Sequence, residues 1–128
     1  MNAIVTTAGG FLGVDLDTEE VEPCDAPLSD LESIETGLPR VVDAAAAGST
    51  VIALVDARPP LLVSYDAGST WNESGRGLPP GVAVAISPEN PDVAVYATSD
   101  RLYVTHDGGR FWHRLELELD AIEDVALE

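Results

Sequence analysis

The chain has 128 residues, a length that fits one domain. Asp and Glu together number 23 against six arginines and no lysine, which gives a formal net charge of −17. Nucleic acids and anionic membranes are therefore excluded as direct partners, because binding to phosphate requires clustered cations. Apolar residues make up 45% of the sequence, which is too many for a disordered acidic tail.

The excess of acidic residues without lysine is typical of a protein whose surface stays hydrated in a high-salt cytoplasm. A cation-binding surface and a basic protein partner are the two alternatives. Cys24 is the only cysteine, so no internal disulfide can form, as expected in a reducing compartment. The N-terminal residues lack the features of a signal peptide, and no run approaches the roughly 20 apolar residues of a membrane span. We therefore expect a cytoplasmic protein with no membrane contact.

Short runs rich in apolar and β-branched residues alternate with Gly, Pro, Asp and Ser, a pattern that predicts an all-β fold. In chain order, the predicted strands cover residues 3–7, 11–16, 40–46, 50–55, 61–65, 82–87, 92–98, 102–105, 112–119 and 122–127. The alanine run at 44–47 has helical propensity but lacks helix caps, so we predict a buried inner strand with small side chains there. Residues 28–35 are predicted to form an acidic surface loop.

Two markers recur along the chain with nearly the same spacing. The pattern Ser/Thr-x-Asp-x-Gly-x-Thr/Phe-Trp occurs twice, 41 residues apart, and the tripeptide Gly-Leu-Pro occurs at 37–39 and 77–79, 40 residues apart. The matching residues of the first pattern are Ser64, Asp66, Gly68, Thr70 and Trp71 in one copy and Thr105, Asp107, Gly109 and Trp112 in the other. Because two independent markers share one period, the sequence predicts a repeated structural unit.

The first pattern resembles the Asp-box, or BNR repeat, of β-propellers such as sialidases, sortilin-type receptors and photosystem assembly factors. The copy at 64–71 matches every position of the motif, and the copy at 105–112 departs only in having Phe111 where threonine is usual. The resemblance implies a propeller blade and gives almost no information about activity. The chain also looks like small acidic haloarchaeal β-propeller proteins, a resemblance that carries a fold and no established activity.

Each Asp-box is expected to form the turn between the third and fourth strands of a blade. Its aspartate would accept backbone N–H groups within the turn, and its glycine would supply a positive φ. Its tryptophan would bury its ring against the neighbouring sheet. A degenerate copy around Asp15 and Asp17 has lost its Gly and Trp. We interpret these boxes as structural rather than catalytic or metal-binding.

A propeller blade has four strands in about 40–45 residues, so the chain is expected to contain three blades. We assign blade two to residues 39–77 and blade three to residues 78–120. The segments 1–38 and 121–128 would together form blade one. In that blade, the inner strand would come from the C-terminal end and the outer three strands from the N-terminal end.

Three blades are too few to close a propeller ring, which typically has four to eight. An unclosed fragment would expose apolar sheet faces and strand edges. The simplest remedy is an obligate homodimer with six blades. In this arrangement, we expect the C-terminal strand of each subunit to complete the first blade of the other.

Propeller ligands generally contact the loops that join strands two and three or strands four and one, on the side opposite the Asp-boxes. Asp56 and Arg58 lie in one such loop, and Asp100 and Arg101 lie in the equivalent loop of the next blade. The two arginines would hold an anion or a carboxylate, or else pair with the adjacent aspartates. The loop at 74–80 belongs to the same set.

The connection at 24–40 is the longest, and long loops on a repeat scaffold often carry function. Its carboxylates Asp30, Glu32 and Glu35 are candidates for binding a partner or a cation. The alternative is that the segment is only a solvated insertion.

Together, these features predict a non-enzymatic scaffold or protein-interaction module whose partners are a second copy of the chain and another protein. One alternative is a module that binds a divalent cation or small ligand through channel or loop carboxylates. Another is a sialidase-like glycoside hydrolase, which is disfavoured because Tyr65, Tyr96 and Tyr103 fall in or beside predicted strands. His106 and His113 are interpreted as isolated surface residues without zinc-site spacing, so we expect neither a metal site nor a cofactor.

Overall fold

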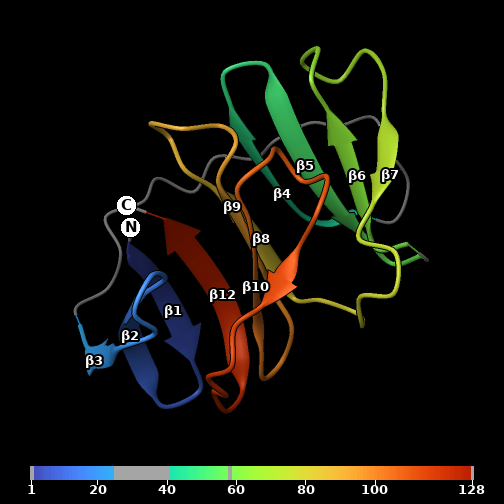
Figure 1. Cartoon of the computed structure of the whole chain (residues 1–128). Coiled ribbons are helices and arrows are strands. Elements are labelled where there is room, and N and C mark those ends of the chain that lie inside the picture. Colours follow the sequence, from blue (N-terminus) through green and yellow to red (C-terminus); the bar gives the residue numbers. More distant parts are fainter. Residues whose placement is uncertain (1, 25–40, 58, 128) are drawn as a thin grey trace.

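The computed structural model of the chain describes residues 2–24, 41–57 and 59–127 (Figure 1). These residues form β-strands and no helix, which confirms the predicted all-β class. The strands are β1 (Asn2–Thr7), β2 (Gly10–Asp15), β3 (Val21–Pro23), β4 (Val41–Ala47), β5 (Thr50–Val55), β6 (Leu61–Ser64), β7 (Asn72–Ser74), β8 (Ala83–Ile86), β9 (Ala94–Ala97), β10 (Leu102–Thr105), β11 (His113–Arg114) and β12 (Ile122–Leu127).

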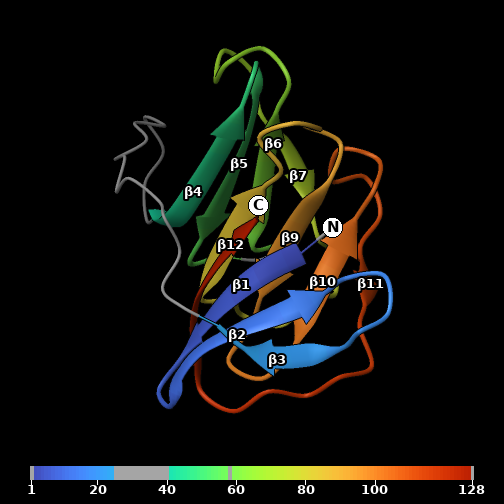
Figure 2. The ribbon, with the colours of Figure 1, turned by 90° about the vertical axis from the view of Figure 1, so that its left-hand side faces the viewer.

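The strands assemble into three antiparallel sheets of four strands each. The first sheet has the order β12-β1-β2-β3, the second β4-β5-β6-β7 and the third β8-β9-β10-β11. In the second and third sheets, each strand pairs with the next one along the chain, as is usual for strands joined by short turns. The first sheet differs because β12, from the far end of the sequence, pairs with β1 (Figure 2).

The pairing of β12 differs from the strand exchange that we expected between two copies. β12 pairs with β1 of its own chain, with Val125 opposite Val5. The turn that leads into β12 is held by a hydrogen bond from the N–H of Ile122 to the carbonyl of Ser99 (2.8 Å). Because this edge of β1 is already hydrogen-bonded, a strand from a second copy is not needed to complete the sheet.

The third sheet lies between the other two (Figure 1). Its strand β8 contacts both β4 and β12, so one edge strand of each sheet meets near the middle of the molecule. Among the described strands, none of the first sheet contacts any of the second. Each of these outer sheets therefore has only one neighbouring sheet within the described chain.

Two apolar clusters cover the two faces of the third sheet. Side chains alternate along β8, so Ala83 and Ala85 belong to the cluster shared with the first sheet, whereas Val84 and Ile86 belong to the cluster shared with the second. All residues of β8 and β9 are buried. This continuous burial explains why these strands are uninterrupted apolar runs rather than alternating ones.

The predicted strand at 112–119 is much shorter in the structure, where β11 contains two residues. The chain then leaves the sheet because another group binds its backbone. The carboxylate of Glu19 accepts hydrogen bonds from the N–H groups of Glu116 (2.6 Å) and Leu117 (3.1 Å). A contact between residues this far apart in the sequence could not be inferred from local pattern.

Two other predictions concern the alanine run at 44–47 and the acidic segment at 28–35. The alanine run at 44–47 is confirmed as strand, since it lies within β4, but the predicted burial is wrong for most of it: Ala47 is buried, whereas Ala46 is exposed on this edge strand. The predicted loop at 28–35 lies outside the described residues.

Candidate functional site

The turn between β6 and β7, which we call the first box turn (residues 64–71), is organised by Asp66. Its Oδ1 accepts hydrogen bonds from Ser64 Oγ (2.7 Å) and the Thr70 N–H (2.8 Å), and its Oδ2 accepts one from the Thr70 hydroxyl (2.6 Å). These donors, above all the Thr70 hydroxyl, lower the pKa of Asp66 to about 2. Gly68 completes the turn with a φ of +91°. The carboxylate therefore fixes the backbone of the turn.

The second box turn (residues 105–112), between β10 and β11, is organised in the same way by Asp107. Its Oδ1 accepts hydrogen bonds from Thr105 Oγ1 (2.6 Å), the Phe111 N–H (3.0 Å) and the Arg110 N–H (3.2 Å). The pKa of Asp107 is lowered, chiefly by the Thr105 hydroxyl. Because Phe111 replaces threonine, this turn lacks the hydroxyl bond that Thr70 makes in the first turn. Gly109 also has a φ of +91°.

The two box tryptophans differ in what surrounds them. The Trp112 indole N–H donates hydrogen bonds to Ser74 Oγ (3.0 Å) and to the Gly109 carbonyl (3.1 Å), and its ring meets Tyr96 edge-on at 6.3 Å. Trp112 thus packs against the neighbouring second sheet. Within the described residues, Trp71 makes no hydrogen bond and no ring contact with another sheet. Both rings are half-buried, and the expected packing against a neighbouring sheet is seen for Trp112 and not for Trp71.

The degenerate box after β2 keeps its aspartate. Asp15 Oδ1 accepts hydrogen bonds from the N–H groups of Asp17 (2.9 Å) and Thr18 (3.2 Å), and these bonds lower the pKa of Asp15. The turn therefore survives without the glycine and tryptophan of the other two copies.

The predicted binding loops contain no cluster of arginines within the described residues. Arg101 donates to the backbone carbonyl of Glu116 (3.1 Å) and lies 3.8 Å from the carboxylate of Glu118, so its partner is not the adjacent Asp100. Asp100 instead accepts a hydrogen bond from the Thr98 hydroxyl (3.3 Å). Asp56 is exposed. Arg58 lies outside the described residues, as do three carboxylates of the long connection, namely Asp30, Glu32 and Glu35.

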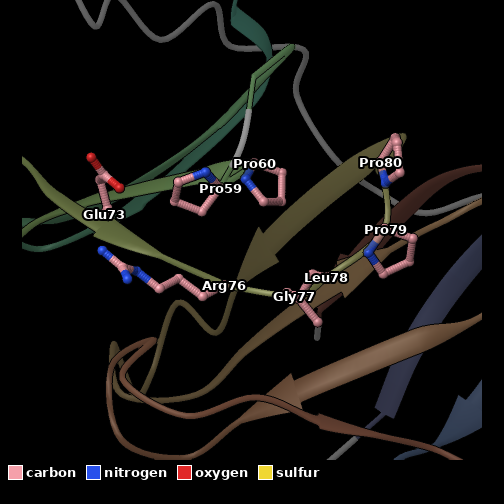
Figure 3. A pocket seen from close by; sticks show the side chains of 8 residues that line it. All are labelled: Pro59, Pro60, Glu73, Arg76, Gly77, Leu78, Pro79 and Pro80. Atoms are coloured by element: carbon pink, nitrogen blue, oxygen red, sulfur yellow. The ribbon is translucent and has the colours of Figure 1, made fainter.

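A groove of about 740 Å³ lies at the junction of the second and third sheets (Figure 3). We call it the proline groove. Its lining comes from the turn before β6, from β7 and from the connection between β7 and β8, and consists of Pro59, Pro60, Glu73, Arg76, Gly77, Leu78, Pro79 and Pro80. Figure 3 shows Glu73 and Arg76 together at one end of the groove, away from Pro79 and Pro80. The loop at 74–80 is among the predicted ligand loops, and its residues 77–79 are the second Gly-Leu-Pro marker, to which the sequence assigns a repeat and no binding role.

Tyr96 on β9 holds one wall of the proline groove in place. Its hydroxyl donates a hydrogen bond to the carbonyl of Pro79 (2.6 Å), and burial raises the pKa of Tyr96 to about 12. Gly81 lies directly against the ring, because a Cβ added at this position would be 2.3 Å from ring atoms of Tyr96. Sequence reasoning missed both residues, since a strand tyrosine and a glycine near prolines carry no local sign of their contact.

The chemistry of the proline groove is that of a binding surface. Proline has no backbone N–H, so the four prolines add apolar rings and no backbone donor to the walls. Arg76 adds one cation and Glu73 one anion, and no ion pair joins them within the described structure. No group of three or more metal-ligating side chains occurs among the described residues. His106 and His113, which we expected to be isolated, stack with ring centroids 5.6 Å apart on the outer strand side.

The carboxylate of Asp43 lies where the edge strands of the second and third sheets meet. Asp43 on β4 accepts a hydrogen bond from the N–H of Val84 on β8 (3.1 Å). Burial raises the pKa of Asp43, and the nearby charge of Asp124 on β12 raises it further. This side chain thus ties the second sheet to the third while its own charge is poorly solvated.

Comparison with known proteins identifies the fold but not an activity. The sequence matches no family model and no curated protein. One similar solved structure is that of YCF48 bound to D1 peptide, with a TM-score of 0.51 and 18% identity, covering 89% of this chain and 36% of that one. Another is the GH74 enzyme of Niastella koreensis, with a TM-score of 0.47 and 21% identity, covering 91% of this chain and 18% of that one.

The chain spans about a third of the length of the YCF48 structure. The described residues contain no helix that is long and apolar enough to cross a membrane. YCF48 is a β-propeller protein, and the three four-stranded sheets of this chain match it in arrangement. The chain therefore has the fold of β-propeller blades.

Proposed function

We propose that this protein is a non-enzymatic β-propeller module that binds an extended segment of another protein in the proline groove. The observation that carries the proposal is the position of this groove at the junction of two blades, formed by the loops that precede strand three and follow strand four. YCF48, a propeller of similar fold, has been solved with a bound peptide, which is consistent with this use of the scaffold.

The lining of the proline groove suits an extended peptide. Proline rings and the Leu78 side chain provide rigid apolar surface, which loses little conformational entropy when a ligand binds. Arg76 can hold a carboxylate or a carbonyl of the bound segment.

Peptide selection in 1 M KCl tests this function. Peptides selected from a random library on the immobilised protein are measured by fluorescence anisotropy against the wild type and Pro80→Trp, which fills the groove from its exposed rim. We expect Pro80→Trp to weaken binding by about tenfold or more. Pro88→Trp is the matched control, since Pro88 is equally exposed on a different turn. Equal binding to all three proteins, or no selected peptide, would overturn the proposal.

We further propose that two copies associate as a homodimer with six blades. Its support is the difference between the two box tryptophans, because Trp112 contacts the preceding blade while Trp71 has no such blade in the described chain. A second copy could place its first sheet there, including Val21 on β3, whose side chain is 41% exposed. The dimer that we propose buries sheet faces and leaves β12 with its own chain.

The two alternative functions gain less support. A module that binds a divalent cation would need several carboxylates around one point, and the described residues contain no group of three or more metal-ligating side chains. A glycoside hydrolase of the sialidase type would need an arginine triad around its substrate. Arg101 instead binds Glu116 and Glu118 of its own chain.

A further inference from the structure

Phe111 is the most exposed large apolar side chain of the described residues, with 79% of its surface accessible. It occupies the position where the first box turn has Thr70, whose hydroxyl donates to Asp66 Oδ2 (2.6 Å). In the second turn, only the backbone N–H of Phe111 reaches Asp107. A hydrogen bond is thus replaced by a solvent-exposed ring that belongs to neither core cluster, and such local exceptions often mark functional positions.

The arginine next to Phe111 is held in a fixed position. The guanidinium of Arg110 lies 4.9 Å from the ring centroid of Tyr65 and donates a hydrogen bond to the Asp107 carbonyl (2.7 Å). The Tyr65 hydroxyl in turn donates to the carbonyl of Gly108 (2.9 Å), across the two box turns. Little side-chain entropy would be lost when this arginine binds a partner.

A second hollow, of about 350 Å³, connects this surface with the proline groove. It is lined by Arg110, Phe111 and Trp112, and it shares Glu73, Arg76 and Leu78 with the larger groove. The combined surface, which we call the extended groove, therefore runs from the proline walls to Phe111. Aromatic residues and arginine are the types most enriched among residues that dominate binding energy at protein interfaces.

Two of the four arginines in the described part of the chain, Arg76 and Arg110, line this second hollow. The chain as a whole carries −17, so two cations beside an exposed phenyl ring form a local exception to the acidic surface. Glu73 lies in the same hollow and would repel a carboxylate placed beside it. A ligand carboxylate is therefore favourable only beside Arg76 or Arg110 within this hollow.

We infer that the extended groove binds an extended acidic protein segment with aliphatic side chains. Its carboxylates contact Arg76 and Arg110, and an aliphatic side chain packs between Phe111 and Leu78. This inference rests on the proposed function and adds the chemistry of the partner and an anchor residue to it.

Salt is expected to strengthen this complex. The remaining acidic surface repels an acidic segment at low ionic strength, but the Debye length falls from about 10 Å at 0.1 M to about 3 Å at 1 M salt. The apolar contact at Phe111 is not screened, and salt weakens the close contacts of the exposed Arg76 and Arg110 less than it weakens the longer-range repulsion. We therefore expect tighter binding in 1 M than in 0.1 M KCl, the opposite of a complex driven by long-range attraction.

The test uses a fluorescein-labelled nine-residue peptide of alternating Glu and Leu, with a Lys-Leu peptide of the same length as comparison. Anisotropy in 1 M KCl measures binding to the wild type, Phe111→Thr and Arg110→Gln. Phe111→Thr restores the threonine of the first turn, so we expect an unchanged or higher melting temperature together with about tenfold weaker binding of the Glu-Leu peptide. Arg110→Gln should weaken it several-fold.

Val42→Thr is the matched control, because Val42 is another exposed large apolar residue, at 53%, on β4 and outside the extended groove. It should bind like the wild type. The inference is overturned if the wild type does not bind the Glu-Leu peptide, if it prefers the Lys-Leu peptide, or if Phe111→Thr leaves binding unchanged. If selected peptides still depend on Pro80 but not on Phe111, the proline groove stands and this extension of it falls.

Discussion

The two box turns have nearly the same local structure but different neighbours. In both, the indole ring lies over the box glycine, since a Cβ on Gly68 or Gly109 would be 3.6 Å from the ring of Trp71 or Trp112. Only Trp112 has a partner on the adjacent sheet, Ser74, whose hydroxyl in turn donates to the Gly109 carbonyl. The turn itself is therefore specified locally, whereas the packing of its tryptophan depends on the preceding blade.

The largest expected effect separates these two tryptophans. Trp112→Ala removes a half-buried ring that packs against the core cluster between the second and third sheets, so we expect a loss of about 2–3 kcal/mol in the free energy of unfolding, less than for a fully buried ring. Trp71→Ala should instead weaken self-association, so its effect on stability should diminish as the protein is diluted. Denaturant unfolding at several protein concentrations measures both. Equal losses that do not depend on concentration would remove the distinction.

The packing between the second and third sheets can also be disrupted at the proline groove. Gly81→Ala places a methyl group against the buried ring of Tyr96, so we expect a destabilisation of about 1–3 kcal/mol and a displaced Pro79 wall. Gly48→Ala is a comparison for backbone effects alone, because its Cβ would meet nothing within 4 Å although its φ is +60°. Thermal melting compares the two. If Gly81→Ala melts like the wild type, the contact with Tyr96 is not restrictive.

The two box aspartates can be compared by acid titration. Hydrogen bonds hold the pKa of Asp66 at about 2, below its ordinary value of 3.8, so its contribution to stability is present above pH 4 and lost as the pH falls toward 2. The pKa of Asp107 is lowered as well. We expect Asp66→Asn to reduce the melting temperature at pH 6 and to have little effect at pH 2. A constant difference between wild type and variant across this range would contradict the assignment.

The smallest effect concerns Asp43. Burial raises its folded pKa, so the ionised form is disfavoured in the fold, and stability falls as the pH rises through that pKa. Asp43→Asn keeps an oxygen acceptor for the Val84 N–H and removes the poorly solvated charge. We expect a slightly higher melting temperature at pH 7 and no gain below pH 4. A lower melting temperature at pH 7 would show that the charge itself strengthens the bond to Val84.

Short apolar runs and the repeated box residues are sufficient to predict local structure. The all-β class and most strand positions followed from short apolar runs, and the box residues make the hydrogen bonds that bend the chain between β6 and β7 and between β10 and β11. Long-range contacts were not predictable in this way. Glu19 ends the strand after Trp112, and Tyr96 positions Pro79, although nothing in their local sequence indicates either contact.

The candidate site was predictable only at the level of loops. Arg101 was a candidate ligand residue, but it is engaged by Glu116 and Glu118 at the end of the short β11. Leu78 belongs to the Gly-Leu-Pro marker at 77–79, but the repeat of that tripeptide indicates a repeated unit and gives no binding role. Arg76 has no motif of its own, because the groove is assembled from three separate segments. Phe111 was noted as a departure from the box, and only its exposure gives that departure a meaning.

Sedimentation equilibrium in 2 M KCl tests most directly whether the second sheet needs a further blade from a second copy. We expect the wild type to sediment at twice the mass of the chain and Trp71→Ala to shift toward the monomer, with Trp112→Phe as a dimeric control. A wild-type protein that stays monomeric at all concentrations, with Trp71→Ala indistinguishable from it, would contradict the proposed closure of the ring.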